Sequence, residues 1–270
     1  MTLIKSISGI RGIVGSSLNY KIISEYIQAF SNILPEGPIL LARDTRQSGL
    51  NFINQSQEIL NKLNRESFIS DIVPTPTAQF MISSNNFIGG VVFTASHNPS
   101  EWNGMKFINS DGIFINQETL NLLETEKKSI NNNIITYDND HNNSLSINKS
   151  VESIDAHIKN ILNLSVINKQ NIKEKKIKVV VDCVNGAASK ALPSLLKSLN
   201  CDVIEIFCKY NERFGRSPEP TPNNLRDLCS MVKKHNADIG LATDPDGDRL
   251  SLVDNHGIAI GEELTLALSV

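Results

Sequence analysis

Long hydrophobic runs and an excess of charge of one sign are both missing from this sequence of 270 residues. No stretch approaches the roughly 18 consecutive apolar residues of a membrane-spanning helix, so the pattern predicts no membrane partner. The first ten residues also lack the apolar core of a secretion signal, and we therefore expect a cytoplasmic protein. Lys and Arg number 26 against 29 Asp and Glu, a formal net charge of −3, which gives no reason to expect nucleic acid as a partner.

Cysteine is scarce, and its spacing indicates neither a metal cluster nor a disulfide framework. The four cysteines lie in the second half of the chain and form no C-x-x-C pair: Cys183, Cys201, Cys208 and Cys229. A chain of this length can bury a sizeable apolar core and does not need disulfides. We interpret the four as small hydrophobic residues in a reducing environment.

Segments with the periods of helices and strands alternate along the chain. At roughly 150 residues per domain, the length suggests two domains. Helical periodicity is found at 22–34, 48–63, 151–164, 187–199 and 225–235. Short apolar runs typical of buried strands are found at 38–43, 68–73, 89–94, 177–182, 203–207 and 238–243. This alternation predicts an α/β protein made of two consecutive layered domains.

One segment, 131–148, interrupts the alternation because Asn, Asp and Ser dominate it and neither period survives. We therefore predict a first domain at 1–135, a linker or loop at 136–150 and a second domain at 151–256. The remaining residues, 257–270, contain an amphipathic pattern and are predicted to open a further domain with a helix.

The first candidate for chemistry is the motif TASHNP at 94–99, which directly follows a predicted strand. Ser96 would lie at the end of that strand, where α/β folds usually bind their ligands. His97 and Asn98 beside it can donate hydrogen bonds to an anion. These six residues alone are equally compatible with an ordinary Ser/Asn/Pro turn.

The second candidate is the motif DPDGDR at 244–249, which also follows an apolar strand. Asp244, Asp246 and Asp248 repel one another in extended backbone unless a cation lies between them. A set of oxygen ligands suits a hard cation such as Mg²⁺. Arg249 could bind a phosphate through two parallel hydrogen bonds.

Three other interpretations of this loop fit the sequence less well. A solvated acidic turn would leave the repulsion between the carboxylates unrelieved. An EF-hand would need Gly at Arg249 and Glu at Asn255, so it fails at both positions. A phosphatase of the haloacid-dehalogenase type carries D-x-D-G-T after a strand, but Asp248 replaces the Thr and few residues follow for its remaining motifs.

Two weaker candidates would contribute cations. In SGIRG at 8–12, the flanking glycines would expose the guanidinium of Arg11 and let backbone amides approach a phosphate. In WNGMK at 102–106, Lys106 is predicted in a turn that could bring its ammonium back towards Ser96. A lysine in a turn is more often simply solvated.

Taken in order, the four motifs resemble those of the α-D-phosphohexomutase family, which includes phosphomannomutase, phosphoglucomutase and phosphoglucosamine mutase. Weaker matches are ARDTRQSG at 42–49, PTPT at 74–77, VDCVNGAA at 181–188 and PEPTPNN at 218–224. The resemblance covers the chain from residue 8 to about residue 263. It implies two three-layer α/β/α domains with mixed sheets.

The resemblance also implies a reaction. Members of the family interconvert hexose 1-phosphate and hexose 6-phosphate through a phosphoserine and a bisphosphate intermediate, with a hexose phosphate as the substrate. Ser96 would be that phosphoserine, primed by an activator such as glucose 1,6-bisphosphate. Ser96 together with Asp244, Asp246 and Asp248 would hold Mg²⁺.

Further roles follow from the matched motifs. Lys106 resembles the general acid/base of the family, and His97 would support the serine. Phosphate would be bound by Arg11, Asn98, Lys106 and Arg249, and Arg11 would also count among the catalytic residues.

The family resemblance also shows which motifs this sequence does not contain. Family members have four domains; the third carries a glycine-rich loop that contacts the sugar, and the fourth a phosphate-binding loop of the R-x-S-G-T type. Neither pattern occurs in these 270 residues, so the sequence does not predict the preferred hexose. It does not predict the oligomeric state either. We expect a truncated product or a fragment, and the alternative to a working mutase is a non-catalytic remnant that binds Mg²⁺ or a phosphosugar.

Overall fold

The computed structural model describes residues 3–130, 134–135, 152–210 and 213–269. In these residues no helix is both long enough and apolar enough to cross a membrane. The chain divides into two compact units. The first consists of Met1–Ile72, Thr77–Ala95 and Glu101–Glu152, and the second of Val73–Pro76, Ser96–Ser100 and Ser153–Val270. The linker predicted at 136–150 lies outside the described residues.

The first unit contains a six-stranded sheet in the order β1-β2-β6-β5-β3-β4. Its strands are β1 (Ile4–Ser6), β2 (Gly9–Ile13), β3 (Ile39–Arg43), β4 (Ser67–Ile72), β5 (Gly89–Phe93) and β6 (Trp102–Asn109). Strand β3 runs parallel to β4 and β5, whereas the pairs β1–β2, β2–β6 and β5–β6 are antiparallel. The sheet is therefore mixed, as the family resemblance implies.

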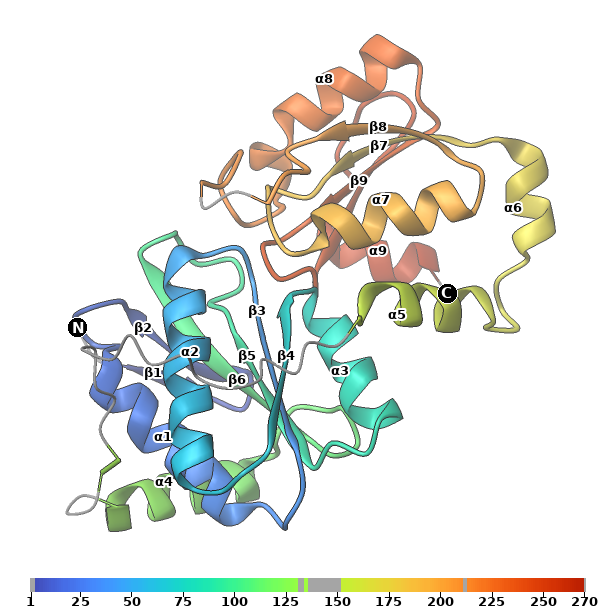
Figure 1. Cartoon of the computed structure of the whole chain (residues 1–270). Helices are drawn as coiled ribbons and strands as arrows, with labels where there is room; N and C mark the ends of the chain where they lie inside the picture. The colour runs from blue at the N-terminus through green and yellow to red at the C-terminus, as the bar shows by residue number, and fades with distance from the viewer. Residues whose placement is uncertain (1–2, 131–133, 136–151, 211–212, 270) are drawn as a thin grey trace. The chain divides into compact units, whose positions relative to one another are not determined.

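Helices cover both faces of this sheet (Figure 1). They are α1 (Tyr20–Ile33), α2 (Gln47–Lys62), α3 (Thr75–Ser84) and α4 (Gln117–Ser129). Leu41 and Phe93 point into the core that α1, α2 and α4 cover. Gly90 faces α3 on the other side, where a Cβ atom would come within 2.5 Å of Ile82 Cδ1. Because side chains alternate across a strand, both faces are apolar and a three-layer α/β/α arrangement results.

The second unit contains a four-stranded sheet in the order β10-β9-β7-β8. Its strands are β7 (Lys178–Asp182), β8 (Asp202–Ile206), β9 (Ile239–Thr243) and β10 (Leu250–Val253). Its helices are α5 (Ile154–Leu162), α6 (Lys169–Lys175), α7 (Ala188–Ser198), α8 (Arg226–His235) and α9 (Glu262–Ser269), with a short 3₁₀ helix η2 (Pro222–Asn224). Strand β7 is parallel to β8 and β9, and β10 is antiparallel to β9.

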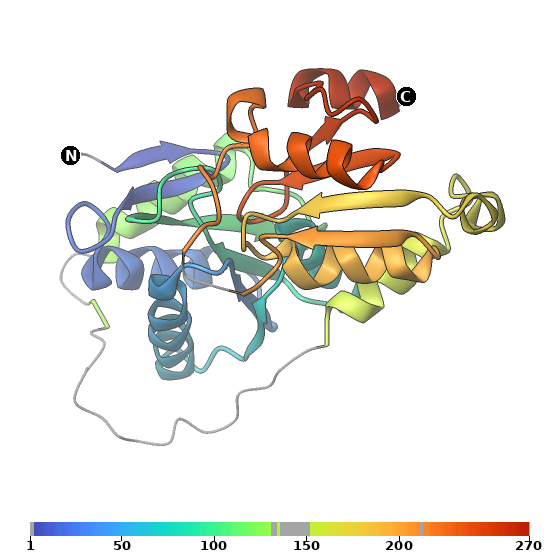
Figure 2. The same ribbon diagram turned by 90° about the horizontal axis from the view of Figure 1, so that it is seen from above.

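The two faces of β7 enter separate apolar clusters. Val179 and Val181 pack with residues of α7, whereas Val180 packs with residues of α8. The two helices therefore lie on opposite faces of the sheet (Figures 1 and 2). This confirms the predicted fold of two three-layer domains with mixed sheets.

The sequence did not predict the strands β1, β2, β6 and β10 or the helices α3, α4 and α6. The prediction of a turn at 102–106 was wrong. Residues 102–106 form the start of β6 rather than a turn, and Lys106 is only 2% exposed rather than solvated. A Cβ atom at Gly104 would lie 2.5 Å from Ile10 O and 2.9 Å from Thr94 O, so glycine is needed because the neighbouring backbones approach closely. The helix expected near the end of the chain is present as α9.

Candidate functional site

Ser96 lies three residues after the end of β5 and has an unusual backbone conformation. Its φ of +50° lies in the left-handed region, which costs a non-glycine residue roughly 1–2 kcal/mol. The side chain is only 3% exposed, and its Oγ donates a hydrogen bond of 2.7 Å to Asp244 Oδ2. Strain of this kind persists where surrounding contacts hold the residue, and it is common at functional sites.

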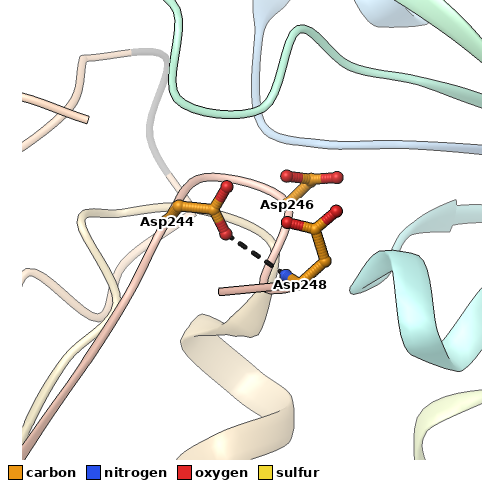
Figure 3. Close-up of side chains that lie close together, drawn as sticks. All are labelled: Asp244, Asp246 and Asp248. Carbon is orange, nitrogen blue, oxygen red and sulfur yellow. Dashed lines mark hydrogen bonds between the residues drawn. The ribbon is translucent and has the colours of Figure 1, made fainter. Parts of the chain in front are cut away.

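The loop between β9 and β10 gathers three carboxylates (Figure 3). Asp244, Asp246 and Asp248 each place an oxygen within 4.8 Å of the others, and the first two side chains are buried. Asp244 Oδ1 accepts hydrogen bonds of 3.2 Å from the backbone N–H groups of Asp248 and Arg249, which folds the loop around this carboxylate. Gly247, with a φ of +68°, completes the turn by donating its N–H to Asp244 O at 3.1 Å.

The electrostatics of this loop favour a divalent cation. Burial raises the pKa of Asp244 well above its usual range, and the negative charges of Asp246 and Asp248 raise it further, while the hydrogen bond from Ser96 acts in the opposite direction. A divalent cation would relieve the repulsion among the carboxylates. The donors are oxygens only, so the residues present fit a hard cation such as Mg²⁺.

Asp246 is held by a residue that sequence reasoning missed. Thr75 Oγ1 donates a hydrogen bond of 2.5 Å to Asp246 Oδ2, and Thr75 N donates one of 2.8 Å to Asp246 O. Thr75 is fully buried and belongs to the second unit. The only signal in the sequence was its place in the PTPT match at 74–77.

The turn before α7 also contacts the acidic loop. Ala187 N donates a hydrogen bond of 2.7 Å to Pro245 O. At Gly186, a Cβ atom would come within 2.5 Å of Pro245 O and 2.7 Å of Pro245 Cα. Only glycine allows this close approach of the two backbones.

We therefore expect Gly186→Ala to displace the acidic loop. The atoms that a new methyl group would meet belong to the backbone of Pro245 and cannot rotate away. We expect the affinity for Mn²⁺, used in place of Mg²⁺, to fall at least tenfold, and the free energy of unfolding to fall by roughly 1–3 kcal/mol. Isothermal titration calorimetry and urea unfolding measure these two quantities.

Gly49→Ala is the matched control for this substitution. Gly49 lies in α2, and a Cβ atom there would meet only the side chain of Arg43, at 3.2 Å. Alanine is favoured over glycine in a helix by up to about 1 kcal/mol, whereas Arg43 must shift by a few tenths of an ångström, so the free energy of unfolding should change little. Equal Mn²⁺ affinities in Gly186→Ala and the parent would show that cation binding does not depend on this contact.

The second unit also places other predicted residues near this loop or in contact with it. His97 Nδ1 lies 3.5 Å from Ser96 Oγ, and Asn98 follows it as a partly buried residue. Arg249 Nη1 forms an ion pair of 3.2 Å with Glu219 Oε1. The unit thus brings together the predicted serine, its neighbouring histidine and the acidic loop.

Arg11 and Lys106 belong to the first unit. Arg11 lies in β2 and is partly exposed, and its Nη2 donates a hydrogen bond of 3.4 Å to Ser8 O. Lys106 Nζ lies 5.4 Å from the centroid of the Phe114 ring. Because Arg11 is paired with Gly104, Arg11 and Lys106 project from the same face of the sheet.

A buried ion pair in the first unit precedes Ser96 along the chain. Asp44, directly after β3, pairs with the buried Arg46 and accepts a hydrogen bond of 2.7 Å from Thr94 Oγ1. Thr94 is two residues before Ser96, so this contact fixes the end of β5. Sequence reasoning did not assign a role to Asp44 or Arg46, although both lie in the ARDTRQSG match.

Comparison with known proteins identifies relatives over both units. Residues 3–133 match the model of phosphoglucomutase/phosphomannomutase α/β/α domain I, and residues 155–257 match domain II of the same family. A phosphomannomutase/phosphoglucomutase from Pseudomonas putida is 35% identical over 96% of this chain and 54% of its own length. A phosphoglucosamine mutase from Coxiella burnetii is 32% identical over 97% of this chain and 58% of its own length.

A solved structure shows the same fold. The phosphoglucomutase/phosphomannomutase family protein from Burkholderia thailandensis superposes with a TM-score of 0.75 at 24% identity, covering 98% of this chain and 58% of its own. The chain therefore spans a little over half the length of the relatives it matches.

Proposed function

Because the chain belongs to the phosphoglucomutase/phosphomannomutase family, we propose that it carries the phosphoryl-transfer residues of an enzyme that converts hexose 1-phosphate into hexose 6-phosphate. The observation that carries this proposal is the 2.7 Å hydrogen bond between Ser96 Oγ and a carboxylate of the three-aspartate loop. A hydroxyl and a divalent-cation site in such contact are what transfer of a phosphoryl group to and from serine requires.

Ser96 is the proposed carrier of the phosphoryl group. A hydroxyl oxygen of the bound hexose monophosphate forms a bond to phosphorus while the bond between phosphorus and Ser96 Oγ breaks. The hydroxyl proton passes by way of a general acid/base, for which Lys106 is our candidate, to the Ser96 oxygen that the phosphoryl group leaves. The resulting hexose bisphosphate then returns its other phosphoryl group to Ser96 Oγ, which yields the isomeric monophosphate and restores the phosphoserine.

Asp244, Asp246 and Asp248 are the proposed ligands of Mg²⁺, with Ser96 as a fourth. When bound, Mg²⁺ neutralises charge that develops on the oxygens of the transferred phosphoryl group. Thr75 and the amides of the loop hold the carboxylates in place through the hydrogen bonds described above.

The remaining polar residues are proposed to bind phosphate. The guanidinium groups of Arg11 and Arg249 suit phosphate oxygens, and Asn98 can donate from its amide. His97, whose Nδ1 lies 3.5 Å from Ser96 Oγ, is proposed to support the serine.

Phosphopeptide mapping tests the proposal directly. We expect the purified chain, incubated with Mg²⁺ and glucose 1,6-bisphosphate, to gain one phosphoryl group on the peptide that contains Ser96. Ser96→Ala should remove this label, whereas Ser100→Ala, four residues further along the same loop, should keep it. Label on another serine that persists in Ser96→Ala would refute the assignment. Stabilisation by Mg²⁺ without any label would instead indicate a chain that binds the cation but does not accept the phosphoryl group.

A further inference from the structure

One arginine of the second unit connects the ends of two central strands. Arg216 Nε donates a hydrogen bond of 2.8 Å to Asp182 Oδ2 at the end of β7, and Arg216 Nη2 donates one of 2.7 Å to Thr243 O at the end of β9. Arg216 Nη1 donates to Ser217 O at 3.0 Å and to Pro218 O at 3.3 Å. All three nitrogens of the guanidinium are thus used.

The contact with Thr243 acts on the residue that immediately precedes Asp244. A carbonyl oxygen held at the end of β9 fixes where the acidic loop leaves the sheet. The side chain of Arg216 is only 6% exposed and that of Asp182 is fully buried, so water competes little for these hydrogen bonds. Charge-assisted hydrogen bonds from a planar guanidinium also constrain direction more strongly than those from an ammonium.

A second connection runs through Asp182. Its Oδ1 accepts a hydrogen bond of 2.9 Å from Val184 N, at the start of the turn that contacts Pro245. Val184 has a φ of +51°, which is an outlier for a β-branched residue and must be held by its surroundings. Arg216 therefore supports the acidic loop both directly, at Thr243, and through the turn before α7.

The segment after Arg216 also contacts the other end of the loop. Glu219 Oε1 forms the 3.2 Å ion pair with Arg249 Nη1, one residue beyond Asp248. Arg216 and Glu219 thus contact the two residues that flank the three aspartates, Thr243 before Asp244 and Arg249 after Asp248.

From these contacts we propose that Arg216 is a positioning residue for the cation site. It does not coordinate the cation, but its guanidinium holds the end of β9 so that Asp244 presents its carboxylate beside those of Asp246 and Asp248. This inference rests on the proposed cation site. Neither the sequence motifs nor the family resemblance gave Arg216 a role.

The experiment compares Arg216→Lys with a control of the same kind elsewhere in the chain. Lysine keeps the positive charge beside Asp182 but has a single nitrogen, which cannot reach the four oxygen atoms that Arg216 contacts. Arg65→Lys is the control, because Arg65 lies in the first unit and contacts the backbone oxygens of Ser31, Pro35 and Gly37. Both substitutions remove a guanidinium that binds several carbonyl groups.

Two measurements are made on the 270-residue chain. The first is the dissociation constant for Mn²⁺ by titration calorimetry, and the second is hydrogen exchange of the peptide that covers residues 240–250 in the absence of metal. We expect Arg216→Lys to weaken Mn²⁺ binding at least tenfold, which corresponds to about 1.4 kcal/mol, and to speed exchange in that peptide. Arg65→Lys should change the dissociation constant by less than twofold and leave exchange in that peptide unchanged. This should hold even if both substitutions lower the free energy of unfolding in urea by the same amount.

Each outcome decides between a positioning role and a merely structural one. Unchanged Mn²⁺ affinity and unchanged exchange in Arg216→Lys would overturn the inference. If the parent chain binds no Mn²⁺, the proposed cation site fails, and exchange alone decides: faster exchange only in Arg216→Lys supports positioning, and equal exchange overturns it. If Arg216→Lys does not fold, Asp182→Asn replaces it, and a folded Asp182→Asn with the parent's affinity and exchange would overturn the inference.

Discussion

Replacing Asp244 by asparagine should weaken binding of a divalent cation on the order of 100-fold while the chain stays folded. The substitution removes one of three carboxylates, and each unit charge a few ångströms from a divalent cation contributes several kcal/mol even at an effective dielectric constant near 20. The asparagine Oδ1 can still accept from the amides of Asp248 and Arg249, so the turn is kept. Loss of one negative charge from a buried site also relieves repulsion in the metal-free protein.

Thermal melts with and without Mg²⁺, together with Mn²⁺ titration, measure this effect. The parent should be stabilised by Mg²⁺ according to the fraction bound, and the shift should nearly vanish in Asp244→Asn. Asp254→Asn is the matched control, because Asp254 Oδ1 accepts from the amides of His256 at 3.0 Å and Ile258 at 2.7 Å in another loop of the same unit. Equal Mg²⁺ shifts in the parent and Asp244→Asn would exclude this loop as the cation site.

Phe107→Ala should lower the free energy of unfolding of the first unit by roughly 3–5 kcal/mol. Phe107 lies in β6 and is only 1% exposed. Its ring centroid lies 4.8 Å from that of Phe30 and 6.2 Å from that of Tyr26, both in α1. The substitution therefore removes a large apolar side chain and leaves a cavity where the sheet meets the helical layer.

Urea unfolding followed by tryptophan fluorescence measures this change, because Trp102 is the only tryptophan in the sequence and lies in β6. Ile113→Ala is the control: Ile113 is 58% exposed, so its truncation should change stability by no more than about 0.5 kcal/mol. A loss below about 1 kcal/mol in Phe107→Ala would mean that the core can collapse around the missing ring.

The elements that the sequence predicted are those whose local pattern agrees with their place in the fold. The run at 177–182 consists largely of β-branched apolar residues, and it forms β7, which is covered on both faces. The acidic motif follows a strand of the same kind, so its position at the end of β9 could be read from the order of residues alone.

Other features depend on contacts that no local pattern contains. The glycine at 104 weakens the strand pattern of β6, yet it is needed because two neighbouring backbones approach it closely. Thr75 is 171 residues from Asp246, and Arg216 is 34 residues from Asp182. A hydroxyl in a short proline-rich motif and an arginine before Ser217 have no distinctive spacing, so only the fold reveals what they bind.

The second unit is built from three separate segments of the chain, so it cannot be expressed whole as one continuous fragment that begins at the Asn-rich segment. A fragment beginning at residue 153 would contain all three aspartates, but the segments Val73–Pro76 and Ser96–Ser100, which belong to the same unit, come from the earlier part of the chain. Such a fragment would lack the hydroxyls of Ser96 and Thr75 that donate to Asp244 and Asp246. Buried carboxylates without their donors cost stability, so dissection at the Asn-rich segment would separate the acids from the groups that hold them. Mixing the two fragments should therefore reconstitute this site better than expressing the second fragment alone.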